Sequence, residues 1–262
     1  MDFSSLLPSL VGIARDAGKI IVDSWDAPRA PRHKGKTDLV TETDLKVQAQ
    51  LKKDLGELLP GSAFLGEEGE GAKTLGDEPT WIVDPVDGTT NFVHRVPFVS
   101  VSVALTVRRA PALGVVCAPM LNECFWAALG QGAWLNSRPI KVSETLELAD
   151  ALMATGFPYE MERELEAILA RLSRVLPATQ GLRRLGSAAI DLAYVACGRL
   201  DAYYEATLKP WDMAAGWLLV KEAGGDVTAL DGGPATPGGS VLASNGFLHA
   251  SVLRLVNLEG RA

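Results

Sequence analysis

The residues most suited to chemistry lie in one short segment, Asp84 to Phe92, which reads DPVDGTTNF. Asp84 and Asp87 follow the apolar residues 81–83, which predict a short buried strand. Two carboxylates about 4 Å apart repel each other by roughly 4 kcal/mol at an effective dielectric constant near 20, unless cations lie beside them. The pair therefore predicts a site for a hard divalent cation, for which carboxylate oxygens are suitable ligands.

The residues that follow the two aspartates predict an anion site next to the cation site. Gly88 allows the backbone to approach a ligand closely. Thr89, Thr90 and Asn91 favour a helix start, where the first amides have no partner within the helix and attract anions. Metal ligands beside free amides suit metal-assisted phosphoryl transfer.

Three further segments carry acidic residues at positions where a site could form. Glu67 and Glu68 follow the apolar residues 63–65, Asp212 lies at a predicted helix start, and Asp44 follows a basic stretch. Each has a plainer explanation when taken alone. Glu67 and Glu68 would form a charged surface loop, and Asp212 and Asp44 would cap helices.

The elements that must position these residues alternate between helical and strand patterns. Apolar residues at helical spacing or helix-start and helix-stop signals predict helices over residues 4–25, from 41 or 43 to 60, over 160–176, 187–197 and 212–223, and after Asn245. Short apolar or alternating runs predict strands at 63–65, 81–83, 98–107, 112–116, 124–128, 151–155, 200–204 and 241–244. The segment 27–36, rich in Pro and basic residues, predicts an exposed, mobile loop. Such runs of strands and helices indicate packed layers, with an antiparallel or mixed sheet in the middle of the chain.

Composition excludes several classes of function. The chain has 262 residues, of which 47% are hydrophobic, so a sizeable core is expected. Its formal net charge of −7 does not favour nucleic acid as a partner. No apolar run reaches the ~18–20 residues of a membrane span, and the N-terminus does not resemble a signal peptide. The three cysteines, Cys117, Cys124 and Cys197, form no CxxC pair, which favours a reduced, cytoplasmic setting.

Taken together in order and spacing, these segments resemble the inositol monophosphatase family of lithium-sensitive, metal-dependent sugar phosphatases. The resemblance covers nearly the whole chain, and its most specific motifs are DPVDGTTNF and the WDMAA that begins at Trp211. It implies an α+β fold, the layered αβαβα sandwich shared with fructose-1,6-bisphosphatase, and a homodimer. It also implies an N-terminal α+β lobe, 1–143, and a C-terminal α/β lobe, 144–262.

The resemblance further implies a role for each site residue. Glu67, Asp84, Asp87, Asp212 and the carbonyl of Val86 would bind two or three Mg²⁺ ions. Glu67 and Thr89, supported by Asp44, would orient the attacking water. The substrate would contact residues of both lobes: Asp87, Gly88, Thr89, Thr90, Ser187, Ala188, Glu205 and Asp212. Little acid–base work by side chains is then needed, because positioning and electrostatics carry phosphoryl transfer.

Several alternatives remain open from the sequence. The predicted substrate is inositol 1-phosphate, but fructose 1,6-bisphosphate, 3′-phosphoadenosine 5′-phosphate and histidinol phosphate are substrates of enzymes with the same metal site. Glu205 favours a polyol, whereas Lys34 and Lys36 could serve a second phosphate. Arg183 or Arg184 could reach the substrate or a partner subunit, and His94 is expected to be structural. A regulatory protein that binds the transcription machinery is the alternative from another class.

Overall fold

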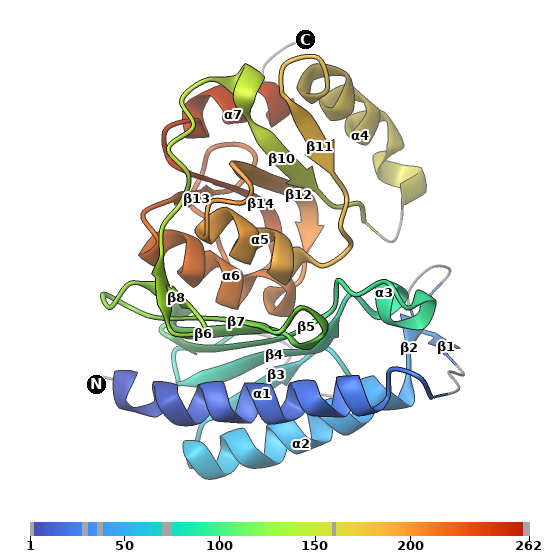
Figure 1. Ribbon diagram of the computed structural model, residues 1–262, viewed down its shortest axis with the longest axis vertical. Coiled ribbons are helices and arrows are strands. Elements are labelled where there is room, and N and C mark those ends of the chain that lie inside the picture. Colours follow the sequence, from blue (N-terminus) through green and yellow to red (C-terminus); the bar gives the residue numbers. More distant parts are fainter. Residues whose placement is uncertain (1–2, 28–30, 36–38, 70–74, 159–160, 259–262) are drawn as a thin grey trace.

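The computed structural model describes residues 3–27, 31–35, 39–69, 75–158 and 161–258. In Figure 1, helices and sheets alternate in five layers, from α1 and α2 at one end to α4 and α7 at the other. This arrangement confirms the α+β layered sandwich that the sequence predicted.

The first sheet has seven strands in the order β3-β4-β5-β6-β7-β8-β9. β3 and β4 are parallel, and the remaining pairs are antiparallel, so the sheet is mixed as predicted. The strands are β3 (Ala63–Gly66), β4 (Thr80–Asp87), β5 (Ser100–Val107), β6 (Ala110–Ala118), β7 (Glu123–Ala128), β8 (Ala133–Leu135) and β9 (Arg138–Ile140).

The second sheet has five strands in the order β11-β10-β12-β14-β13. Its strands are β10 (Leu152–Thr155), β11 (Gly181–Arg183), β12 (Ala202–Leu208), β13 (Asp226–Thr228) and β14 (Gly239–Ser244). The helices are α1 (Leu7–Asp23), α2 (Glu42–Leu58), α3 (Thr89–His94), α4 (Met161–Val175), α5 (Ala188–Ala196), α6 (Pro210–Glu222) and α7 (His249–Val256).

The layers follow from where apolar residues lie on each helix. α1 buries Leu10, Ala14, Ala17 and Ile21, one stripe at helical spacing, because only one of its faces meets a sheet. α5 and α6 lie between the two sheets (Figure 1) and bury residues on nearly all sides. A single core cluster accordingly contains residues of both sheets together with α5 and α6. The division at residue 143 into two lobes stays a prediction.

Small residues set how closely the middle helices approach their neighbours. A Cβ atom added at Gly114 of β6 would lie 2.9 Å from the carbonyl oxygen of Ala215 in α6. A Cβ atom at Gly216 would lie 2.5 Å from Leu192 of α5. The α6 backbone therefore packs directly against the first sheet and against α5. The Ser102 hydroxyl of β5 also donates to the Trp211 carbonyl oxygen in the first turn of α6 at 3.1 Å.

Two segments differ from the sequence predictions. Arg32–His33, inside the predicted loop 27–36, forms the short strand β1, which pairs with β2 (Leu39–Val40). Residues 28–30 and 36 of the predicted loop lie outside the described residues. β4 continues through Pro85 to Asp87, with an irregular register against β5 between Asp84 and Asp87. Pro85 is tolerated there because the ladder is already interrupted.

The strands β8, β9, β11 and β13 were not predicted. Each has only three residues, too few for an alternating pattern to stand out from a loop. Their positions are fixed by pairing with longer strands.

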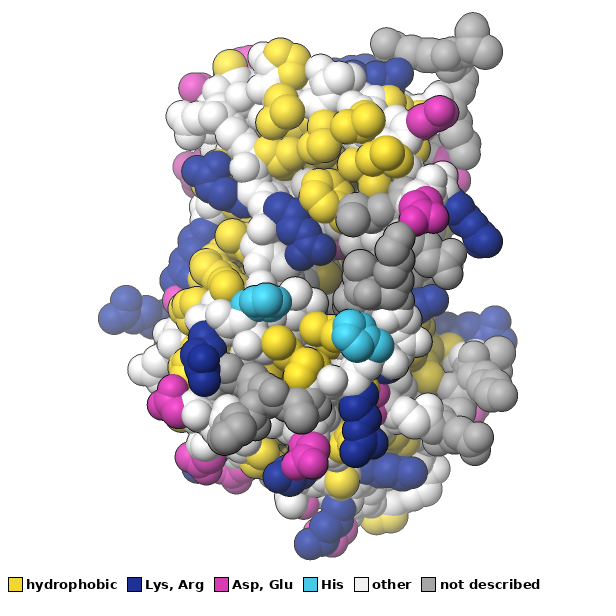
Figure 2. All heavy atoms as spheres, turned by 90° about the vertical axis from the view of Figure 1, so that its right-hand side faces the viewer, with side chains coloured by type: hydrophobic (Ala, Val, Ile, Leu, Met, Phe, Trp, Pro, Cys, Tyr) yellow, Lys and Arg dark blue, Asp and Glu magenta, His cyan; other side chains and the backbone are white. Residues whose placement is uncertain are grey.

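One face of the molecule exposes a group of apolar side chains. Hydrophobic side chains gather at the upper end of the face in Figure 2, on the side where Figure 1 places α4. α4 itself exposes Leu165 and Leu169, with Leu176 exposed just beyond its end. No helix in the described ranges is long and apolar enough to cross a membrane.

Candidate active site

Four of the predicted metal ligands come from the carboxyl ends of β3 and β4 and from the first turn of α6. Glu67 directly follows β3, and its amide donates to the Val83 carbonyl oxygen of β4 at 3.1 Å. Because β3 and β4 are parallel, their carboxyl ends lie side by side, and Glu67 is brought next to Asp84. Asp87 ends β4, and Asp212 lies in the first turn of α6.

The charges of the four carboxylates act on one another. Burial raises the pKa of Asp84 well above its ordinary value, and the charges of Glu67, Asp87 and Asp212 raise it further. Burial likewise raises the pKa of Asp212, and the charges of Asp87 and Glu67 add to the effect. Mutual repulsion among buried carboxylates is the electrostatic pattern expected of a site for cations.

The hydrogen bonds of the three aspartates leave one oxygen of each free. Asp84 accepts from the Val86 amide at 3.0 Å through Oδ1, and Asp212 accepts from the Lys209 amide at 2.6 Å through Oδ2. Asp87 uses only Oδ2, which accepts from the Ala189 amide at 2.8 Å and from the hydroxyls of Ser100 and Ser187. The other oxygen of each aspartate accepts no hydrogen bond from the described residues.

This donor set fits divalent cations such as Mg²⁺, which take hard carboxylate oxygens. Within the described ranges, no three carboxylate, imidazole or thiol groups already surround one point closely enough to hold an ion. The capping bond from the Lys209 amide is also the plain structural role expected of Asp212, and it coexists with that residue's free oxygen.

Thr89 and Asp44 form the contact that the sequence predicted between them. The Thr89 hydroxyl lies 2.9 Å from Asp44 Oδ1 and 3.0 Å from the Val86 carbonyl oxygen, and all of these groups are buried. Asp44 Oδ2 accepts from the Thr41 amide at 2.9 Å and from the Thr41 hydroxyl, which makes Asp44 part of the cap of α2. The helix cap thus fixes the carboxylate that orients Thr89.

Gly88 has the backbone that the predicted phosphate loop requires. Its φ of 95° lies in the left-handed region, and a Cβ atom there would lie 2.8 Å from the Phe98 carbonyl oxygen. Gly88 caps α3, so Thr89 and Thr90 begin that helix as predicted. Their amides have no acceptor within the helix.

Lys34 holds the loop that carries Glu67. Its ammonium group lies 2.7 Å from Glu67 Oε1 and 2.7 Å from Glu68 Oε1. Burial raises the pKa of Glu67 to about 7, and Lys34 opposes that rise. Lys36, the other lysine considered for a second phosphate, lies outside the described residues.

The second sheet contributes the predicted substrate residue Glu205. Glu205 is buried in β12, and its Oε2 accepts from the Tyr203 hydroxyl. A Cβ atom on Gly156 would lie 1.9 Å from Glu205 Oε2, so a larger residue at this position would displace the carboxylate. Burial raises the pKa of Glu205 to about 7.

Ser187 and Ala188, also predicted to contact substrate, stand at the start of α5. The Ser187 hydroxyl accepts from the Ile190 amide at 3.3 Å and donates to Asp87, so this helix start fixes a metal-ligand candidate. Of Arg183 and Arg184, the two arginines considered for contact with the substrate, the structure favours Arg184, because its charge acts on Glu205. The guanidinium carbon of Arg184 lies 5.7 Å from the centre of the Phe157 ring. His94 is exposed and ends α3, in line with a structural or surface role.

Sequence reasoning missed the residues that hold the site together. The Asn91 amide group donates to the carbonyls of Phe98 and Leu185, both at 2.8 Å, and so joins α3 to the segment before α5. Gln48 of α2 binds both the amide and the carbonyl of Glu68 and fixes the loop that carries Glu67. Asn91 stood inside the recognised motif, but no local pattern distinguished Gln48.

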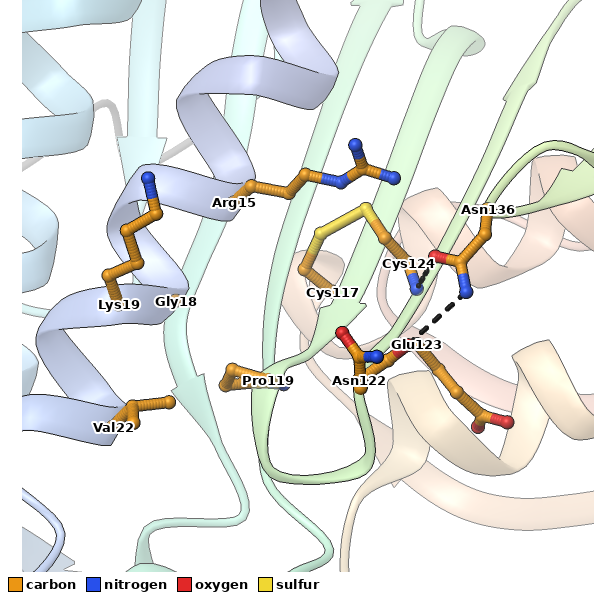
Figure 3. Close-up of a pocket in the computed structure, with 10 residues that line it drawn as sticks. All are labelled: Arg15, Gly18, Lys19, Val22, Cys117, Pro119, Asn122, Glu123, Cys124 and Asn136. Carbon is orange, nitrogen blue, oxygen red and sulfur yellow. Dashed lines mark hydrogen bonds between the residues drawn. A yellow bond between two sulfur atoms is a disulfide. The ribbon is translucent and has the colours of Figure 1, made fainter.

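A cavity of about 450 Å³ lies away from these carboxylates, between α1 and the β6–β7 hairpin. Figure 3 shows Arg15 and Lys19 of α1 on one side and a disulfide on the other. Cys117 and Cys124 form this disulfide, so the expectation of reduced cysteines is wrong for this pair. They are direct partners in the β6–β7 ladder, a proximity that the spacing in sequence did not reveal.

Comparison with known proteins decides the family. The model of the inositol monophosphatase family matches residues 2–260. The chain belongs to this family. It is 43% identical to an inositol-1-monophosphatase of Synechocystis over 89% of this chain and 82% of that protein.

Solved structures agree with this membership of the inositol monophosphatase family. The inositol monophosphatase of Anabaena (Nostoc) matches with a TM-score of 0.88 and 36% identity, over all of both chains. The extragenic suppressor protein SuhB of Bartonella henselae matches with a TM-score of 0.89 and 36% identity, over 96% of this chain and 98% of that one. The family predicted from sequence motifs is therefore confirmed.

Proposed function

We propose that this protein hydrolyses the phosphate monoester of a small polyol, with inositol 1-phosphate as its substrate. The observation that carries the proposal is the set of three aspartates, Asp84 and Asp87 buried and Asp212 half-buried, each with one oxygen that accepts no hydrogen bond from the described residues. Family membership supports phosphate monoester hydrolysis as the reaction class.

The residues suited to hold two or three Mg²⁺ ions are Glu67, Asp84, Asp87, Asp212 and the Val86 carbonyl. When bound, such ions polarise phosphoryl oxygens and lower the pKa of a bound water. The protein prepares for this by fixing Asp87 with α5 and Asp212 with the Lys209 amide. Each carboxylate is thus oriented before a ligand arrives, which reduces the ordering cost of binding.

The chain's own residues position the water and the phosphate. When Thr89 donates to Asp44, the lone pairs of its hydroxyl oxygen are free to accept a hydrogen bond from a water molecule. Glu67, at the end of β3, would hold the same water from the other side. The amides of Gly88, Thr89 and Thr90 would donate to the phosphate oxygens. Glu205 would accept hydrogen bonds from the hydroxyls of the leaving alcohol.

A bisphosphate substrate is less compatible with the described charges. Lys34, one lysine considered for a second phosphate, is already bound by Glu67 and Glu68. Glu205 is an acceptor, and a phosphate monoester, whose second pKa is about 6, is mostly a dianion without a proton to donate at neutral pH. We therefore favour a polyol over fructose 1,6-bisphosphate or 3′-phosphoadenosine 5′-phosphate.

The test compares phosphate release from inositol 1-phosphate and fructose 1,6-bisphosphate under identical conditions with Mg²⁺. We expect the first ester to have the higher kcat/KM and Asp84→Asn to abolish both activities. Faster turnover of the bisphosphate would reject inositol phosphate as substrate. Wild-type activity in Asp84→Asn would reject the proposed site.

Three further expectations accompany this function: a homodimer, a cytoplasmic location and inhibition by Li⁺. They rest on the resemblance to the family and on composition, and sedimentation, fractionation and inhibition assays test them. The regulatory alternative predicts that Asp84→Asn still retains transcription proteins in a pulldown. We expect no such retention.

A further inference from the structure

Asp191, in the first turn of α5, is a buried carboxylate without a hydrogen-bond donor. Its exposed fraction is 1%, and its Oδ1 has no partner among the described residues. Two other buried side-chain atoms within the described ranges share this condition, but both belong to uncharged residues, Trp81 and Tyr204. An unsatisfied buried polar group costs about 1–3 kcal/mol, and more when it is charged. A ligand that donates a hydrogen bond to this oxygen would offset that cost.

The position of Asp191 on α5 directs it toward the candidate active site. Its amide donates to the Ser187 carbonyl oxygen at 3.0 Å, so the two residues lie one turn apart on the same side of the helix. Ser187 binds Asp87 through its hydroxyl. Asp191 is therefore the next side chain along the helix face that meets the acidic cluster.

The charges around Asp191 link it to the pocket of the leaving alcohol. Burial raises its pKa well above the ordinary value, Asp87 and Glu205 raise it further, and Arg184 lowers it. Asp191 also acts on Tyr203, the residue whose hydroxyl binds Glu205. Among the described residues, Arg184 makes no ion pair with either carboxylate.

Glu205 presents a second open acceptor in the same place. Its Oε2 is occupied by the Tyr203 hydroxyl and packs against Gly156, whereas Oε1 accepts no hydrogen bond from the described residues. Glu205 and Asp191 thus form two fixed carboxylates, each with an oxygen that requires a donor. A polyol carries several hydroxyl donors, whereas a second phosphate is mostly a dianion without a donor at neutral pH.

We propose that Asp191 is a second hydroxyl-binding residue of the leaving-group pocket, which accepts a hydrogen bond from a polyol hydroxyl next to the one that binds Glu205. This inference rests on the proposed function and deepens it. It assigns specificity for polyols to a pair of carboxylates rather than to Glu205 alone. It also gives a function to a buried carboxylate of α5 whose Oδ1 has no partner among the described residues.

The experiment measures KM and kcat of Asp191→Ala with two esters, inositol 1-phosphate and p-nitrophenyl phosphate, whose leaving group carries no polyol hydroxyls. We expect KM for inositol 1-phosphate to rise about tenfold, the loss of one hydrogen bond to a charged group. KM for p-nitrophenyl phosphate should change less than twofold. If the alanine variant does not fold, Asp191→Asn carries the test with an expected rise of about threefold, because an amide oxygen is a weaker acceptor.

Asp201→Asn is the matched control. Asp201 is a buried carboxylate of the same half of the chain, but its oxygens accept from the Ser143 hydroxyl and the Leu152 amide at 2.6 and 2.7 Å. We expect this variant to lower thermal stability and to leave both KM values unchanged.

The two hypotheses fail in different ways. Equal KM changes for the two esters, or no change for inositol 1-phosphate, would overturn the role of Asp191 while the proposed function stands. If the wild-type protein hydrolyses neither ester, the proposed function fails and the inference with it.

Discussion

Replacing Thr89 with valine tests the water-positioning part of the mechanism. Valine has nearly the same shape but lacks the hydroxyl that lies 2.9 Å from Asp44 Oδ1. General acid–base groups contribute about 10²–10⁴-fold to rate, so we expect kcat to fall at least about 100-fold. KM should change little, because the amide of residue 89, which we assign to the phosphate, remains.

The same substitution predicts a measurable loss of stability. Asp44 Oδ1 loses its donor, which costs about 1–3 kcal/mol for a buried group. At about 2–4 °C per kcal/mol for a chain of this size, Tm should fall by roughly 2–12 °C. Differential scanning calorimetry measures this change, and phosphate release at saturating Mg²⁺ measures kcat.

Two control variants separate chemistry from packing. Thr89→Ser keeps the hydroxyl and should retain activity within about tenfold. His94→Gln changes an exposed side chain of the same helix, α3, and should leave kcat unchanged. If Thr89→Val hydrolyses inositol 1-phosphate at the wild-type rate while folded, the assignment of Thr89 to the water is wrong.

Three further predictions concern the cations, the phosphate loop and the disulfide. Burial raises the pKa of Glu67 from 4.5 to about 7, so folding favours its protonated form. The metal-free protein should therefore lose stability as pH rises from about 4.5 to 7. Because Mg²⁺ binds the ionised form, it should raise Tm more at pH 8 than at pH 5.5. An equal Mg²⁺ effect at both pH values would contradict this. Gly88→Ala should lower the free energy of unfolding by more than the ~1 kcal/mol expected of Gly61→Ala. Both glycines have positive φ, but only at Gly88 would a Cβ atom meet a carbonyl oxygen. Equal losses in urea unfolding would argue against a crowded loop at Gly88. Reduction of Cys117–Cys124 should lower the free energy of unfolding by about 2.5 kcal/mol on the chain-entropy model, and an unchanged denaturation midpoint would show that the disulfide does not contribute.

Most of the secondary structure could be predicted because its signals are local. The stripe of Leu10, Ala14, Ala17 and Ile21 has helical period, and β5 alternates along its length. Asp84, Asp87 and Gly88 could be predicted as site residues because they lie in one contiguous motif, DPVDGTTNF, which is far more specific than an Asp-Gly turn alone. Three-residue strands gave no such signal.

The rest of the site depends on contacts between distant segments. Asn91 reaches Leu185, which is 94 residues away, and Gln48 reaches Glu68 from another helix. Asp191 has an ordinary helical pattern around it, and only its burial without a donor distinguishes it. Cys117 and Cys124 meet because two strands pair in one register, which their spacing in the sequence does not specify.

The most direct measurement is an anomalous difference map from a crystal of this protein soaked in Mn²⁺ and phosphate, with Mn²⁺ in place of Mg²⁺. Our account predicts Mn²⁺ peaks among Glu67, Asp84, Asp87 and Asp212, with phosphate against the amides of residues 88–90. Mn²⁺ bound elsewhere, or phosphate held without contact to those amides, would contradict it.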